Sequence, residues 1–260
     1  MPFTLAHPAA VLPLYRRLRD PGVTSAFVIG SMSPDFIYWL PWPVYRDASH
    51  TIPGLFLFCL PAGFSMFWLY HLLLKAPLLD LLPRAIFVRL PPPRPLSTYL
   101  RNVVLVLLAV LLGATTHLVW DAFTHHDTLA TQLLPFLKTP LLTGNGYVLR
   151  VYKVLQHGST LVGLSALLHF GWRWYQRTPP RQNMDGKGLA TWQKVILVAC
   201  LIMPSAIAGI QAGWHQARWD PSLLGLQKFL SSGVVTGIGI FSTLLVILGL
   251  IWPWVERRME

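Results

Sequence analysis

His117, Asp121 and His125 lie four residues apart near the end of an apolar segment that reads NVVLVLLAVLLGATTHLVWDAFTHH. Positions separated by four residues stack on one face of an α-helix, so these three side chains should project together. A bilayer tolerates ionisable groups poorly, since each costs roughly 2.5–3.5 kcal/mol near its centre on insertion scales. A row of imidazole, carboxylate and imidazole therefore indicates a functional site, for which a divalent metal is the first candidate. The alternative is a buried polar row that satisfies itself through hydrogen bonds between helices.

Three residues nearer the N-terminus could supply further metal ligands: His7 in TLAHPAA, Asp35 in GSMSPDFIYW and His50 in DASHTIPG. Each also has a structural explanation. His7 could be a surface residue, Asp35 could cap a helix, and His50 could lie at the level of the lipid head groups. For each of the three, the residues alone leave both explanations open.

Neighbouring polar residues could orient these ligands or a substrate. His126 points about 100° away from His125 on a helix, so only one of them should join the row, and we choose His125. The candidates for orienting a ligand or substrate are Asp47, Gln156 and His157. For the last two, polar helix packing through small residues is an equally good explanation.

The composition is that of an integral membrane protein. Of 260 residues, 53% are hydrophobic and only 12% are charged, about half the charge of a soluble domain. The net charge of +11 fits Lys and Arg in cytoplasmic loops, and no basic–aromatic interleaving indicates nucleic-acid binding. Cys59 and Cys200 lie in apolar stretches, so we interpret them as small hydrophobic residues. Gly-rich phosphate loops and the common hydrolase motifs are absent from the sequence.

Spanning a membrane takes about 20 mostly apolar residues. We predict an all-α, polytopic helical membrane protein forming a single domain over 1–260, with an N-terminal helical, partly inserted region over 1–51 and a bundle over 52–255. A helix broken at Ser33–Pro34 is expected in the N-terminal region. The five predicted spans are 53–74, 102–121, 151–173, 193–213 and 230–254, of which the third is the most polar.

The basic residues predict the orientation of these spans. The most basic connections are 75–101, 173–194 and the C-terminal tail, which five spans place on one side of the membrane. The positive-inside rule makes that side cytoplasmic, although Arg16, Arg17 and Arg19 argue against it. All the candidate ligands then lie at the non-cytoplasmic face.

The blocks MPFTLAHPAAVLPL, IGSMSPDFIYWL, SHTIPG, HLVWDAFTHH and VLQHGSTLVGL together resemble a known family. They are similar to the bacterial multi-pass proteins of unknown-function family 4184, over most of the chain. The order of His, Pro-Asp, Ser-His and His-x-x-x-Asp is also similar to inner-membrane metal-dependent hydrolases of the YdjM type. Those in turn resemble zinc-dependent phospholipase C and P1-type nucleases, although this chain has fewer acids in its candidate site. The resemblance implies a bacterial inner-membrane location and a phosphoester hydrolase.

The residues and the resemblance together predict a membrane hydrolase that uses a zinc-like divalent metal on a phosphoester, with a lipid head group as one candidate substrate. The predicted ligands are His7, Asp35, His50, His117, Asp121 and His125. Asp121 and His125 are the predicted catalytic residues, with His125 as ligand or general base. Two alternatives remain: a transporter or proton relay that uses the same polar cluster, and an inactive scaffold for membrane partners.

Overall fold

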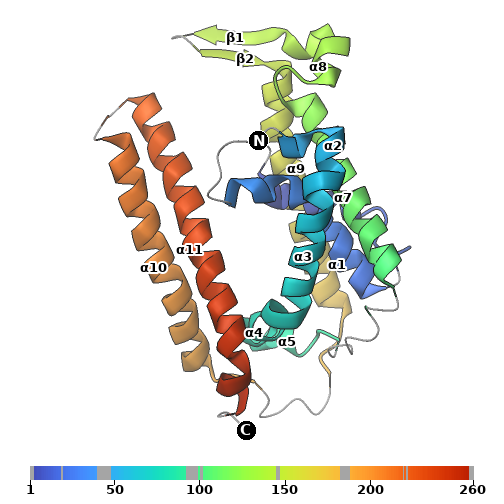
Figure 1. The fold of residues 1–260 in the computed structure, drawn as a ribbon, viewed down its shortest axis with the longest axis vertical. Coiled ribbons are helices and arrows are strands. Elements are labelled where there is room, and N and C mark those ends of the chain that lie inside the picture. Colours follow the sequence, from blue (N-terminus) through green and yellow to red (C-terminus); the bar gives the residue numbers. More distant parts are fainter. Residues whose placement is uncertain are drawn as a thin grey trace. The chain divides into compact units, whose positions relative to one another are not determined.

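The computed structural model describes residues 3–18, 20–39, 48–91, 99, 102–144, 147–181, 188–218, 220 and 222–257. This described part is predominantly helical, which confirms the predicted all-α fold (Figure 1). It divides into two compact units, Met1–Phe67 with Pro92–Thr178 and Trp68–Pro91 with Pro179–Glu260. The predicted single domain over 1–260 stays a prediction.

The N-terminal region forms three short helices: the 3-10 helix η1 (Thr4–Val11), the α-helix α1 (Pro21–Gly30) and the 3-10 helix η2 (Ser33–Trp39). Asp20 caps α1, since its carboxylate accepts hydrogen bonds from the backbone N–H groups of Gly22 and Val23. Pro21 occupies the first turn of α1, where its missing N–H costs nothing. The chain breaks between α1 and η2 just before Pro34, in the motif where a broken helix was predicted.

The remaining helices of the first unit include α7 (Val103–Thr124) and α9 (Val151–Arg177). A continuous helical stretch leads from the first unit into the second. It comprises α2 (Ile52–Gly54), the π-helical turn η4 (Leu55–Cys59), α3 (Leu60–Leu69), the π-helical turn η5 (Tyr70–Leu74) and α4 (Lys75–Leu81). The short helix α5 (Arg84–Phe87) follows it.

Helices α1 and α7 approach each other closely at two glycines. An added Cβ on Gly30 would lie 2.7 Å from the Cα of Val110, and one on Gly113 would lie 2.6 Å from the backbone N of Ser31. Real Cβ atoms do not come that close to backbone atoms. Glycine therefore permits the contact, as small residues do between membrane helices. This packing fixes α1 and the turn after it against the helix that carries His117.

Helix η1 packs on α9 in the same unit. The backbone N–H of Phe3 donates to Oγ1 of Thr160 at 3.2 Å. A Cβ added to Gly163 would meet the carbonyl oxygen of Ala6 at 3.0 Å. η1 therefore lies along the middle of α9, and His7 is positioned by that contact.

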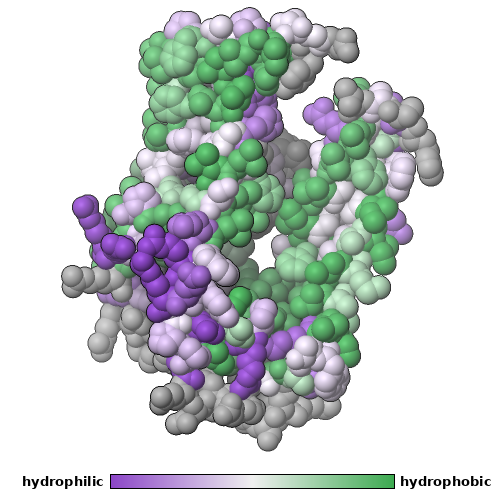
Figure 2. All heavy atoms as spheres, turned by 180° about the vertical axis from the view of Figure 1, so that it is seen from behind, coloured by the Kyte–Doolittle hydropathy of each residue, from purple (hydrophilic) through white to green (hydrophobic). Residues whose placement is uncertain are grey.

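Beyond α7 the chain forms α8 (Leu129–Leu133), the 3-10 helix η6 (Pro135–Lys138) and an antiparallel hairpin of β1 (Pro140–Gly144) and β2 (Tyr147–Arg150). These elements lie between the predicted spans 102–121 and 151–173 and were not predicted from the sequence. Many large apolar side chains here are exposed, among them Leu129, Leu133, Phe136 and Leu142. Hydrophobic surface is also extensive on the long helices (Figure 2).

The second unit is built on two long helices, α10 (Thr191–Ala217) and α11 (Leu223–Arg257). They approach closely where a Cβ on Gly209 would lie 2.7 Å from the carbonyl oxygen of Gly233. A cluster of buried apolar residues joins them to the end of the helical stretch before them: Leu74, Leu189, Leu201, Leu245, Leu248 and Trp252.

Four described helices are long and apolar enough to cross a membrane, which is consistent with a membrane protein. They are Ile52–Leu81, Val103–Leu133, Thr191–Ala217 and Leu224–Val255, and they match four of the five predicted spans. The predicted span 151–173 is helical as part of α9 and has the required length. It is not among the four, because polar residues such as Lys153, His169 and Arg173 lower its mean hydropathy.

Candidate metal centre

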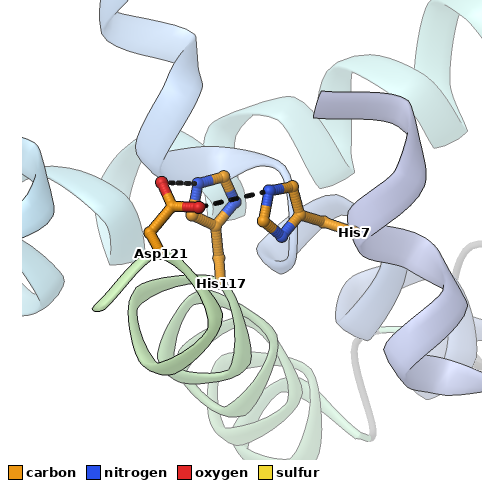
Figure 3. A group of neighbouring side chains, drawn as sticks. All are labelled: His7, His117 and Asp121. Atoms are coloured by element: carbon orange, nitrogen blue, oxygen red, sulfur yellow. Dashed lines mark ion pairs between the residues drawn. The ribbon is translucent and has the colours of Figure 1, made fainter. Parts of the chain in front are cut away.

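Five of the predicted ligands converge in the first unit. His117 and Asp121 project from one face of α7, as their spacing predicts. His7 comes from η1, Asp35 from the first turn of η2, and His50 from the residues just before α2. Figure 3 shows His7 of η1 reaching toward the side chains of the other two residues drawn, both on α7. Short N-terminal helices thus supply the ligands that α7 lacks.

The ligand atoms are spaced as they would be around an ion. Direct hydrogen bonds have their mode at about 2.9–3.0 Å, whereas two ligands on a tetrahedral zinc ion at roughly 2.0–2.1 Å lie about 3.3 Å apart. The separations are 3.4 Å for His117 Nε2–Asp121 Oδ2, 3.4 Å for His50 Nε2–Asp35 Oδ1, 3.6 Å for His50 Nε2–Asp121 Oδ2, 3.7 Å for His7 Nε2–Asp121 Oδ1 and 3.7 Å for His117 Nε2–Asp35 Oδ1. Two overlapping groups of three could each hold a metal ion, and both include His117.

Five of these six atoms lack hydrogen-bond partners. Nε2 of His7, His50 and His117 and Oδ1 of Asp35 and Asp121 are buried and make no hydrogen bond in the described structure. Buried polar atoms are nearly always paired, and each unpaired one costs about 1–3 kcal/mol. Five such atoms in two overlapping groups are difficult to explain as a packing device. A bound cation would satisfy them together.

His117 is held in the tautomer that a ligand needs. Its Nδ1 lies 2.7 Å from the backbone carbonyl oxygen of Ser31. A carbonyl only accepts hydrogen bonds, so Nδ1 must carry the proton, and Nε2 of the neutral ring then presents its lone pair to the cluster. The ring is fully buried and stacks on the ring of His7, with centroids 3.6 Å apart and planes 13° apart.

Two more side chains orient ligands by contacting the ligand atoms that face away from the cluster. Oγ1 of Thr4 donates to Oδ2 of Asp35, which leaves Oδ1 directed at the cluster. Oγ of Ser49 lies 2.9 Å from Nδ1 of His50. Sequence analysis missed Thr4, Ser49 and the Ser31 carbonyl as positioning groups. Adjacency to His50 could have indicated Ser49, whereas the other two depend on contacts between separate elements.

The pKa values of the two ligands that lie outside the spans, His7 and Asp35, favour the protonation states that bind metals. Burial lowers the pKa of His7 to about 4, and the neighbouring His117 acts in the same direction. Burial alone would raise the pKa of Asp35, but His50, His117 and Thr4 together hold it below its usual value. At neutral pH His7 is therefore a neutral imidazole and Asp35 a carboxylate, the forms in which these groups bind metals.

His125 lies at the rim of the cluster. It ends α7 in an extended backbone conformation, and its Nδ1 is 3.6 Å from Oδ2 of Asp121. Its side chain is 28% exposed, against 0% for His117. His126 is 57% exposed and pairs with Asp127 away from the cluster. The structure thus brings the predicted one of these two histidines toward the ligands.

The three predicted orienting residues have different environments. Gln156 is buried, and its Oε1 accepts a hydrogen bond of 2.8 Å from Nζ of Lys153. His157 is exposed and belongs to neither ligand group found in the described structure. Asp47 lies outside the described residues. The roles predicted for all three stay predictions.

The fold and the cluster define a class: a helical protein with several helices able to cross a membrane and a buried His/Asp group that could hold a metal ion. The chain belongs to the family described as "Domain of unknown function (DUF4184)", whose model matches residues 1–250. This confirms the family predicted from the motifs. No matching curated protein and no matching solved structure was found. The more distant similarity to YdjM-type hydrolases and zinc-dependent phospholipase C stays a prediction.

Proposed function

We propose that the protein is a metal-dependent membrane hydrolase that cleaves a phosphoester. The observation that carries the proposal is the set of five buried ligand atoms that have no hydrogen-bond partner and are spaced for coordination. Two carboxylates and three imidazoles are the donors that zinc-like ions bind in catalytic sites. A purely structural zinc site needs only four ligands, and a catalytic one keeps a position open for water or substrate.

A divalent ion at such a site supplies Lewis acidity toward a phosphoryl oxygen and lowers the pKa of water toward about 7. The chain's own residues would hold that ion in a largely dry environment. The side chains of His117 and Asp35 are 0% and 3% exposed, whereas His50 and His125 are 20% and 28% exposed. Water would therefore reach the site beside His50 and His125. His125, with Asp121 next to it, is positioned to exchange a proton with a reacting group at this opening.

We also propose that this opening faces the non-cytoplasmic side of a bacterial inner membrane. The basic connections around 75–101 and 173–194 support this orientation through the positive-inside rule. Substrate would then reach the site from the outer leaflet or the space outside it.

The first test is elemental mass spectrometry on detergent-purified protein, comparing the wild type with His117→Ala and His126→Ala. His126 matches His117 in residue type but is exposed and outside the cluster. The wild type and His126→Ala should carry zinc, manganese or iron in a fixed ratio to protein, and His117→Ala should lose it. Absence of metal from the wild type, even after reconstitution with each ion, would overturn the proposal.

Activity is tested on the metal-loaded protein with phosphodiester and phosphomonoester substrates. Asp121→Asn keeps the size of the side chain but removes its charge, so the variant should fold and lose hydrolysis. A protein that binds metal yet hydrolyses no phosphoester, and instead shows ion flux that depends on a pH gradient, would be a transporter or relay. Retention of full activity in Asp121→Asn would refute the role of the cluster.

A further inference from the structure

A large apolar cavity borders the candidate metal centre. Its volume is about 770 Å³, and η1, α7 and α9 form its walls. This volume lies within the roughly 300–1,000 Å³ of small-molecule sites. Ala6, Val119, Trp120 and Val162 contribute apolar wall, and His7 is both a wall residue and a predicted ligand. The cavity and the metal centre therefore share a residue within one unit of the fold.

The cavity offers almost no hydrogen bonds to a ligand. Three hydroxyl-bearing residues line it, but each donates to the backbone of its own helix: Thr115 to Leu111, Thr116 to Gly113 and Ser159 to Gln156. His7 and the indole N–H of Trp120 are the remaining polar groups among the lining residues. A site of this kind recognises hydrocarbon by burial and shape rather than by polar contacts.

The length of the cavity fits an alkyl chain. Its lining on α9 runs from Val154 to Gly163, which is about 13 Å at the helical rise. One leaflet of hydrocarbon is half of the roughly 30 Å bilayer core, so the two lengths agree.

We propose that this cavity holds one acyl chain of a membrane phospholipid, whose phosphate then lies at the metal centre beside His7. The substrate class would be a membrane phospholipid rather than a water-soluble phosphoester. This identification of the substrate rests on the proposed function, but occupancy of the cavity by an acyl chain can be measured without catalysis. The exposed apolar flanks of the cavity, Val119 at 55% and Val162 at 70%, would admit the chain sideways from the bilayer.

Gly158 offers a clean way to block the cavity. It lines the cavity, and a Cβ added there would meet nothing within 4 Å. Gly158→Phe should therefore place its ring in the cavity, because its Cβ meets no neighbouring atom. Gly171 lies on the same helix outside the cavity and is equally open, so Gly171→Phe is the matched control.

The first experiment uses photocrosslinking in vesicles of phosphatidylglycerol that carries a diazirine midway along one acyl chain. Peptide mass spectrometry should place the label on the 115–120 and 154–163 segments of the wild type and of Gly171→Phe. Labelling there should fall severalfold in Gly158→Phe, while metal content stays unchanged. Equal labelling of these segments in both variants, or label spread evenly over all apolar helices, would overturn the proposal.

The second experiment separates this inference from the proposed function. With metal-loaded protein, Gly158→Phe should raise the KM for the long-chain phospholipid and leave hydrolysis of a water-soluble phosphodiester unchanged. Equal loss on both substrates would contradict a role in chain binding. If no phosphoester is cleaved while Gly158→Phe still abolishes site-specific labelling, the hydrolase proposal fails and the acyl-chain site stands.

Discussion

Replacing Gly113 with alanine should weaken the metal centre without touching any ligand. A Cβ at this position would lie 2.6 Å from the backbone N of Ser31, whose carbonyl accepts the hydrogen bond from His117 Nδ1 at 2.7 Å. The same Cβ would lie closer still to the carbonyl oxygen of Phe27, so α1 must move away from α7 by about 1 Å to reach ordinary contact. The hydrogen bond to His117 would then lengthen toward about 3.7 Å, beyond the usual range.

Two effects of known size follow for Gly113→Ala. Overpacking a tight contact costs about 1–3 kcal/mol of folding free energy. Loss of the partner that orients a metal-bound histidine typically weakens metal affinity by about 10–100-fold. The control is Gly171→Ala on α9, where an added Cβ meets nothing within 4 Å. That variant should gain up to about 1 kcal/mol from helix propensity and bind metal as the wild type does.

The assay has two readouts on detergent-purified protein: thermal unfolding of the chelated form, and metal affinity by competition with a chelator of known strength. Gly113→Ala should lower both the melting temperature and the affinity, and Gly171→Ala should lower neither. If Gly113→Ala kept the affinity of the wild type, the Ser31 carbonyl would not be what orients His117, and this account of the site's geometry would be refuted.

Two further predictions concern pH and topology. Because the pKa of His7 is about 4 in the folded protein, against 6.5 for the free side chain, the unfolded state binds more protons between these values. Acidification from pH 6.5 to 4 should therefore remove about 3 kcal/mol from the metal-free protein, and the lowered pKa of Asp35 acts in the same direction at still lower pH. Thermal unfolding of chelated protein measures this, and a melting temperature that stays flat down to pH 4.5 would contradict it. To test the topology, single cysteines are introduced at Lys138 and Thr178 in a cysteine-free background and labelled with an impermeant maleimide. The two cysteines should react from opposite sides of the membrane. If both react from the same side, α9 does not cross.

The ligand row was predictable because its information is local. A spacing of four residues fixes His117 and Asp121 on one helix face in any environment. The addition of His7, Asp35 and His50 rested on the order of motifs, because nothing in their local sequence determines how near they lie to α7. That proximity depends on glycine contacts between α1 and α7 and on the packing of η1 against α9.

Other parts of the fold were not predictable from pattern alone. The hairpin of β1 and β2 is short, and its strands lack a clear alternation of apolar and polar residues, since all five residues of β1 are exposed. The rim position of His125 follows from the end of α7, because a C-terminal residue with extended backbone no longer obeys the helical period. Helix ends are the least certain feature of a sequence pattern.

The mean hydropathy of α9 is a poor guide to whether this helix crosses the membrane. The backbone N–H of Arg181, just after α9, donates to the carbonyl oxygen of Val88 at 2.8 Å, and Val88 follows the span Ile52–Leu81. If Ile52–Leu81 and Val103–Leu133 both cross, the chain must cross once more before Arg181 to reach Val88. The helix α9 has 27 residues, or about 40 Å, which exceeds the roughly 30 Å required.

Part of the polar character of α9 does not oppose this crossing, because it faces protein rather than lipid. Gln156 is buried, Thr160 accepts from the backbone of Phe3, and Gly163 packs against Ala6. A mean hydropathy counts every residue of a helix as if it faced lipid. A helix that packs against η1 on one face has to be apolar only on the faces that contact lipid. Thr160 and Gly163, which hold η1 and with it His7 in place, lie on this covered face.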